Sequence, residues 1–197
     1  MTSDAARLDY RIIAGIIEPG SKVLDLGCGN GELIAYLERE KKARVQGIEL
    51  DEDAIYKCVE KGLSVLHSDI DRGLKNYPDK SFNYVILNQS LQEIKKISYV
   101  IDESLRVGEK AVIGFPNFAN LWARSMLFLR GKVPITRSLP YKWHDTPNLR
   151  FLSINDFEDF CREKHLKVLK RYFLGRERLV NFLPNLFALN AIFVVTK

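Results

Sequence analysis

Apolar and polar positions alternate along this chain with two different periods, one typical of strands and one typical of helices. Short apolar runs predict strands at 21–26, 43–50, 63–66, 81–87 and 110–115. Between these runs, apolar residues recur every three or four positions and predict amphipathic helices at 4–17, from 32 onward, at 53–61 and at 94–106. This alternation indicates an α/β fold in which helices cover both faces of a parallel sheet.

The pattern changes after the fifth predicted strand. Segment 117–149 opens with apolar residues that suggest a helix or a helix pair, and then becomes rich in Pro, Arg and Tyr without clear periodicity. Two more strands are predicted at 166–173 and 188–196, and their short separation favours an antiparallel pair. We therefore expect a three-layer fold with a sheet of seven strands, the last pair antiparallel. One domain over 1–197 would carry an insertion at 117–149.

The first predicted strand runs into a turn in which Gly27, Gly29 and Gly31 alternate with other residues. Glycine adopts backbone angles closed to other residues and lets a ligand approach the main chain, and the helix that follows offers unpaired N–H groups. The spacing matches neither the dinucleotide fingerprint nor the P-loop, which needs a Gly-Lys-Ser/Thr sequence. The turn thus predicts a small polar or anionic ligand, with an ordinary structural turn as the alternative.

Polar residues follow several of the predicted strands. Glu49 ends the second strand about 20 residues beyond the turn, where nucleotide-binding α/β folds place a carboxylate that accepts hydrogen bonds from ribose hydroxyls. Its alternatives are a solvent-exposed acid at a strand end and a charge at a helix N-terminus. Asp69 follows the third strand and is either a ligand contact or a turn and cap residue. Together with Asp25 and Asn88, these side chains are expected at the carboxyl edge of the sheet, where ligands bind in such folds.

Composition and charge narrow the class of protein. A hydrophobic content of 46% with 28% charged residues is typical of a globular chain. We expect a cytoplasmic protein without a signal peptide or a membrane span. Three cysteines, far apart in the sequence, predict neither a disulfide framework nor a metal site. The net charge of +5 is concentrated in a stretch whose only acid is Asp145, with the basic residues Arg124, Arg130, Lys132, Arg137, Lys142 and Arg150.

The turn Asp25-x-Gly-x-Gly-x-Gly31 resembles the first motif of class I S-adenosylmethionine-dependent methyltransferases. From Arg7 to Lys197 the chain further resembles MetW-type proteins of bacterial methionine biosynthesis. The motifs that carry this resemblance are Arg7-Leu-Asp9, Val23 to Gly31, Gly47-Ile-Glu-Leu-Asp51, Asn88-Gln-Ser-Leu-Gln92, Phe115-Pro-Asn-Phe118 and Leu139-Pro-Tyr-Lys-Trp-His-Asp-Thr-Pro-Asn148.

The resemblance implies a Rossmann-like class I methyltransferase sheet, S-adenosylmethionine as cofactor with S-adenosylhomocysteine as product, and work beside a homoserine O-acyltransferase. It implies the turn at the methionine portion, Glu49 at the ribose, Asp69 with Ile70 at the adenine, and Arg7 at the cofactor carboxylate. The full cofactor-binding set that we predict is Arg7, Asp25, Gly27, Cys28, Gly29, Asn30, Gly31, Glu49, Leu50, Asp69, Ile70, Asn88 and Gln89.

Three functions remain open from the sequence. The first is methyl transfer to a small-molecule or protein acceptor, with Tyr141, His144 and Asp145 as candidate catalytic residues; His144 and Asp145 form either an acid/base site or a loop anchor. The second is a non-catalytic regulatory module that binds the cofactor and docks on the acyltransferase through the basic insertion. The third, nucleic-acid methylation, ranks last because the Asn-Pro-Pro-Tyr/Phe signature is missing.

Overall fold

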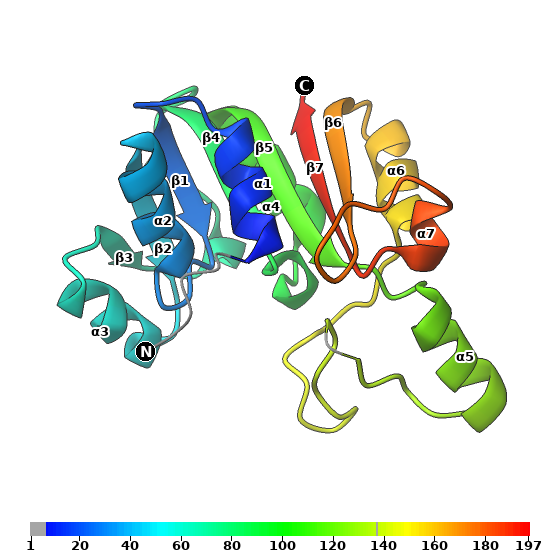
Figure 1. Ribbon diagram of the computed structural model, residues 1–197. Coiled ribbons are helices and arrows are strands. Elements are labelled where there is room, and N and C mark those ends of the chain that lie inside the picture. Colours follow the sequence, from blue (N-terminus) through cyan, green and yellow to red (C-terminus); the bar gives the residue numbers. More distant parts are fainter. Residues whose placement is uncertain (1–6, 137) are drawn as a thin grey trace.

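The structure is a computed structural model that describes residues 7–136 and 138–197. Its centre is one seven-stranded sheet in the order β3-β2-β1-β4-β5-β7-β6 (Figure 1). The first five strands run parallel, whereas β7 is antiparallel to both β5 and β6. The predicted fold class and the antiparallel last pair are therefore confirmed. The strands are β1 Lys22–Leu26, β2 Arg44–Glu49, β3 Val65–His67, β4 Phe82–Asn88, β5 Gly108–Pro116, β6 Lys167–Leu174 and β7 Asn190–Thr196.

Helices cover both faces of the sheet. For the helix predicted at 4–17, residues 4–6 lie outside the described part of the chain, and the described helix is α1. The helices are α1 Leu8–Ile16, α2 Glu32–Lys41, α3 Glu52–Glu60, α4 Ile97–Val107, α5 Leu121–Arg130, α6 Ile154–Glu163 and α7 Pro184–Phe187, with the 3₁₀ turns η1 Ile70–Arg72 and η2 Leu91–Glu93.

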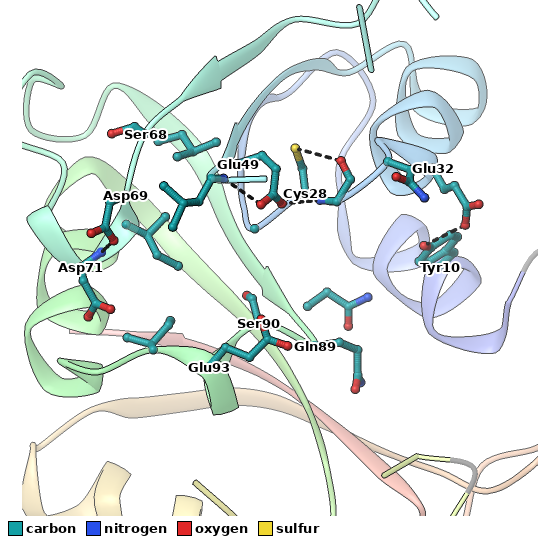
Figure 2. A pocket seen from close by; sticks show the side chains of 18 of the residues that line it. Tyr10, Cys28, Glu32, Glu49, Ser68, Asp69, Asp71, Gln89, Ser90 and Glu93 are labelled. Carbon is teal, nitrogen blue, oxygen red and sulfur yellow. Dashed lines mark hydrogen bonds between the residues drawn. The ribbon is translucent and has the colours of Figure 1, made fainter. Parts of the chain in front are cut away.

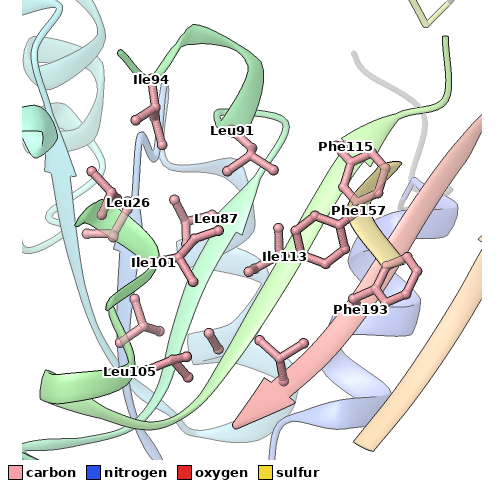
Figure 3. Close-up of a cluster of buried hydrophobic side chains, with 14 of the residues drawn as sticks. Leu26, Leu87, Leu91, Ile94, Ile101, Leu105, Ile113, Phe115, Phe157 and Phe193 are labelled. Carbon is pink, nitrogen blue, oxygen red and sulfur yellow. The ribbon is translucent and has the colours of Figure 1, made fainter. Parts of the chain in front are cut away.

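Two apolar cores lie on opposite faces of the sheet. One contains Ile13 of α1 and Leu37 of α2, both fully buried against β1 and β4. The other contains side chains of α4 and α6, including Ile101 and Phe157 (Figure 3). There the Phe157 ring lies 4.9 Å from the ring of Phe193 between centroids. Burial on both faces explains why the central strands are almost wholly apolar in sequence.

Helix α4 begins at Ile97 rather than at the expected residue 94. The preceding residues Leu91–Glu93 form the turn η2 instead. The Asp71 carboxylate accepts a hydrogen bond from the Lys96 N–H at 2.7 Å, so another segment satisfies an N–H group just before the helix starts. This contact joins elements far apart in the sequence, which is why helical periodicity did not reveal the start.

Among the described residues, the insertion at 117–149 contains one helix, α5, which is the first of the two expected alternatives, a helix or a helix pair. Its base is fixed by Asn117, which is fully buried and donates hydrogen bonds to the carbonyl oxygens of Asn185 and Ala188. Asn120 caps α5 by accepting from the Ala123 N–H at 3.0 Å. Beyond this base, α5 and the loop that follows it stand away from the sheet (Figure 1).

The insertion returns to the body at Arg150. Its guanidinium group donates to the carbonyl oxygens of Ile94 at 2.7 Å and Lys95 at 2.9 Å. The neighbouring Leu149 N–H donates to the carbonyl oxygen of Gln92 at 2.9 Å. The end of the insertion is thus bonded to the segment that follows β4. Within residues 7–136 and 138–197, no helix combines the length and apolar character needed to cross a membrane.

Candidate functional site

A cavity of about 470 Å³ lies at the carboxyl ends of the parallel strands, within the size range of small-molecule sites (Figure 2). In open α/β sheets, ligands bind in the crevice outside the carboxyl ends of the strands. The lining residues come from α1, the glycine turn and the segments after β2, β3 and β4, and are Arg7, Tyr10, Gly27, Cys28, Gly29, Asn30, Glu32, Ile48, Glu49, Leu50, Ser68, Asp69, Ile70, Asp71, Asn88, Gln89, Ser90, Glu93 and Ile94.

The glycine turn is held in a conformation that excludes other residues. Gly27 has a φ of +75° and Gly31 a φ of +73°, both in the left-handed region. A Cβ on Gly31 would lie 2.5 Å from Leu63 Cδ1, and one on Gly27 would lie 2.8 Å from Ser90 Cβ. Glycine at these two positions is therefore required both by backbone conformation and by close packing.

Glu49 joins the end of β2 to the glycine turn. Its carboxylate accepts hydrogen bonds from the N–H groups of Gly29 at 2.7 Å, Leu50 at 2.7 Å and Asp51 at 3.0 Å. It also lines the cavity and lies between the turn and the segment after β3 in Figure 2. The side chain thus fixes the turn and presents a charged acceptor to a ligand.

Asp25 lies behind the turn and not in the cavity wall. Its side chain is buried, and burial together with the negative charge of Glu49 raises its pKa from 3.8 to about 7. Gly31 also lies outside the lining residues, because it forms the start of α2. Both residues shape the turn in this structure without facing the cavity.

Asn88 connects β4 to the start of α1. Its Nδ2 donates to Asp9 Oδ2 at 3.0 Å, and Asp9 in turn holds Arg7 through an ion pair of 2.7 Å. The Asn88 Oδ1 atom is buried and has no hydrogen-bond partner among the described residues. A buried acceptor without a donor is costly. The atom lies against Gly114 of β5, where a Cβ would stand 2.3 Å from it.

Asp69 forms the predicted turn cap and lies at the cavity, while its predicted ligand contact stays a prediction. Its carboxylate caps the turn η1 by accepting from the Asp71 N–H at 2.9 Å, and the residue also lines the cavity beside Ile70. Asp71 is used elsewhere, since its carboxylate accepts from the N–H groups of Lys95 and Lys96. The cap therefore orients Asp69 at the cavity edge.

The structure brings together every predicted cofactor residue except Asp25 and Gly31 as lining of this cavity. The three candidate catalytic residues are not brought together. Tyr141 lines a neighbouring cavity, whereas His144 and Asp145 are exposed and line neither. His144 instead contacts Trp143 edge to face, with ring centroids 5.5 Å apart.

Several residues that line the cavity were not among the predicted ones. Tyr10 lies three residues beyond Arg7, and its ring is 4.6 Å from the Arg7 guanidinium carbon. The i, i+3 spacing was therefore a signal in the sequence that could have identified Tyr10. Glu93 continues the motif that begins at Asn88 and faces the cavity from the side opposite Glu49 in Figure 2. Partial burial and the charge of Glu49 raise the pKa of Glu93. The motif that begins at Asn88 therefore extends to Glu93, one residue beyond the predicted end.

The fold and its edge cavity define the class I S-adenosylmethionine-dependent methyltransferase architecture. A methyltransferase structure from Mesorhizobium loti superposes with a TM-score of 0.71 at 14% identity, covering 98% of this chain and 99% of that one. A second, from Archaeoglobus fulgidus, gives a TM-score of 0.70 at 17% identity, covering 96% of this chain and 91% of that one. At such identities the likeness establishes the fold alone.

The chain belongs to the MetW family, because residues 7–195 match the sequence model described as methionine biosynthesis protein MetW. A relative from Rhodopirellula baltica, the bifunctional methionine biosynthesis protein MetXA/MetW, is 34% identical over 175 residues. That match covers 84% of this chain and 28% of the relative. The chain therefore corresponds to less than a third of a longer, two-function polypeptide in that organism.

Proposed function

We propose that the edge cavity binds S-adenosylmethionine. The observation that carries this proposal is the Glu49 carboxylate at the end of β2, bonded to the Gly29 N–H at 2.7 Å and exposed to the cavity. An acceptor there suits ribose hydroxyls, and the glycine turn leaves main-chain room for the methionine portion. Asp69 and Ile70 would contact the adenine. Asn88 and Gln89 would lie near the sulfonium group.

The bound cofactor supplies an electrophilic methyl group. The chain's own contribution would be positioning and exclusion of water, since methyl transfer needs mainly an in-line approach of the nucleophile. Apolar side chains at the cavity, among them Ile48 and Ile94, reduce contact with solvent. Arg7 lies at the cavity mouth, where its positive charge would attract the cofactor carboxylate.

Replacement of Glu49 tests this proposal. Glu49→Ala removes the ribose acceptor and one tether of the turn, so affinity for S-adenosylmethionine should fall by about tenfold or more, as for a lost charge-assisted hydrogen bond. Isothermal titration calorimetry measures the effect. Glu52→Ala is the matched control, because Glu52 is exposed on α3 and does not line the cavity. Unchanged affinity of Glu49→Ala for S-adenosylmethionine would contradict the role of Glu49 at the ribose.

A second candidate function is partnership with a homoserine O-acyltransferase, either beside methyl transfer or as a purely regulatory role. Helix α5 supports it, since Phe128 is 89% exposed, Leu129 74% and Trp122 61%, while only Ala123 is buried. Exposed apolar clusters of this kind are typical of interaction sites. The fused MetXA/MetW relative supports an acyltransferase as the partner.

Two basic residues of the insertion donate hydrogen bonds within the chain. Arg124 donates to the Ala119 carbonyl oxygen and Arg150 to two carbonyl oxygens, so these cations are used within the fold. Arg137 lies outside the described residues. We take the methyl acceptor or partner to be a small molecule or a protein, because the Asn-Pro-Pro-Tyr/Phe signature is missing. The chain would form a single methyltransferase-like domain and act in the cytoplasm.

Co-purification tests the partnership. A Trp122→Ser, Phe128→Ser variant should lose association with a co-expressed homoserine O-acyltransferase, because two exposed apolar anchors are removed. Tyr56→Ser is the control, since Tyr56 is 67% exposed on α3, away from α5. If the double variant still binds the acyltransferase, or if neither form ever does, α5 is not the docking site for this enzyme.

A further inference from the structure

A second cavity, of about 950 Å³, lies beside the first. Its walls come from α1, the segment after β4, the insertion and the connection between β6 and β7. Arg7, Gln89 and Glu93 line both cavities, so the two meet at these residues. Gln89 has a φ of +63°, a backbone angle that residues other than glycine rarely adopt. Strained backbone of this kind clusters at ligand sites.

Gln92 lines this second cavity and carries an acceptor without a partner among the described residues. The residue is 6% exposed, and its Nε2 donates to the Gln89 carbonyl oxygen at 2.6 Å. Its Oε1 atom is buried and has no partner among the residues that the structure describes. An unpaired buried carbonyl costs free energy comparable to a lost hydrogen bond, so the site favours a ligand with an N–H or O–H donor.

Charged groups of both signs line the same cavity. Within the described chain, the side chains of Arg11 and Arg176 form no ion pair or hydrogen bond, and the same holds for the carboxylates of Glu93 and Glu177. Arg7 is different, since it forms an ion pair with Asp9 at 2.7 Å and also lines the first cavity. Two guanidinium groups and two carboxylates without partners match a ligand that carries both an anionic and a cationic end.

We propose that the second cavity binds a small zwitterionic ligand of the amino-acid class. Its carboxylate would face Arg11 and Arg176, and its ammonium group would face the Gln92 Oε1 atom and Glu93. Tyr141, at the wall formed by the insertion, would then contact the ligand's side chain. This inference deepens the proposed function, because it names the class of molecule held next to the cofactor cavity.

Calorimetry with matched analogues tests the proposal. The full chain is titrated with glycine, L-norleucine and L-phenylalanine, and with norleucinamide and hexanoate, which each lack one charge of norleucine. At least one amino acid should bind saturably, and norleucine should bind about tenfold more tightly than either single-charge analogue, as expected for a lost charge-assisted contact. Binding of none of the amino acids, or equal binding of hexanoate and norleucine, would overturn the proposal.

Variants separate this site from the first cavity. Arg176→Gln and Gln92→Leu should weaken norleucine binding by about tenfold. Arg178→Gln should not, because Arg178 lies on the same exposed connection but lines neither cavity. Arg176 is exposed, so its variant stays informative if Gln92→Leu misfolds. Separate titration with S-adenosylmethionine distinguishes the two failures: retained cofactor binding without amino-acid binding rejects only the second site, and the reverse result rejects only the proposed cofactor.

Discussion

The glycine turn and the insertion both begin where a parallel strand leaves the sheet at its carboxyl edge, β1 for the turn and β5 for the insertion. The turn passes directly into α2, and Gly31 packs against Leu63 and Cys58. The insertion exposes most of its large apolar side chains, including Phe128. The chain's own core therefore fixes the geometry of the turn, whereas the insertion has surface left for contacts with other molecules.

Two glycines at helix ends give the largest expected contrast. Gly31→Ala should destabilise the fold by about 3 kcal/mol, because its φ is +73° and the new Cβ would meet Leu63 Cδ1 at 2.5 Å. Gly131→Ala, at the end of α5, should cost only about 1 kcal/mol, since its φ is +59° but no atom lies within 4 Å of the new Cβ. Urea unfolding measures both. Equal losses would contradict the contrast in packing.

The pH dependence of stability gives the next largest effect. Asp25 has a folded pKa of about 7 against 3.8, so the stability it contributes is present below about pH 4 and is lost as the pH rises through 7. Between pH 5 and pH 8, the wild type should therefore lose roughly 2–3 kcal/mol relative to Asp25→Asn.

Urea unfolding at pH 5, 6.5 and 8 follows this difference. Asp145→Asn is the control from the insertion, where the side chain is exposed, and it accounts for the removal of one surface carboxylate. A constant difference between Asp25→Asn and the wild type would show that the carboxyl group behind the turn has an ordinary pKa.

The smallest effect is expected on the surface of the insertion. Phe128→Ser should change the free energy of unfolding by less than about 0.5 kcal/mol, because the ring is 89% exposed and leaves no cavity. Affinity for S-adenosylmethionine should also be unchanged. A large loss of stability would mean that α5 packs on the body, and would remove the distinction between the two regions.

Much of the fold was predictable, because the periodicity of apolar residues and the polar residues at strand ends indicate the same parallel sheet. The apolar run 81–87 and the alternation of strands with helices identified the parallel part of the sheet. The glycine spacing with Glu49 and Asp69 located most of the cavity, since residues at strand ends share one edge of the sheet. These features depend on local sequence and on a topology that allows few arrangements.

The remainder depends on contacts between distant segments. Helix α4 begins at Ile97, directly after Lys96, whose N–H donates to the Asp71 carboxylate. No local sequence pattern predicts a hydrogen bond between such distant residues. His144 and Asp145 are adjacent in sequence, yet neither lines a cavity, because adjacency does not determine where an irregular loop places its side chains. The second cavity could not be predicted, as its walls come from four separate parts of the chain.

Arg150 has a consequence for communication within the molecule. It bonds the end of the insertion to Ile94 and Lys95, directly after Gln92 and Glu93, which line the cavities. A partner that bound the insertion and shifted this joint would alter ligand affinity, and thermodynamic reciprocity requires the ligand to alter the partner's affinity by the same factor. Through the Arg150 guanidinium group, the affinity for a ligand in the cavities and the affinity for a partner on the insertion would thus be coupled.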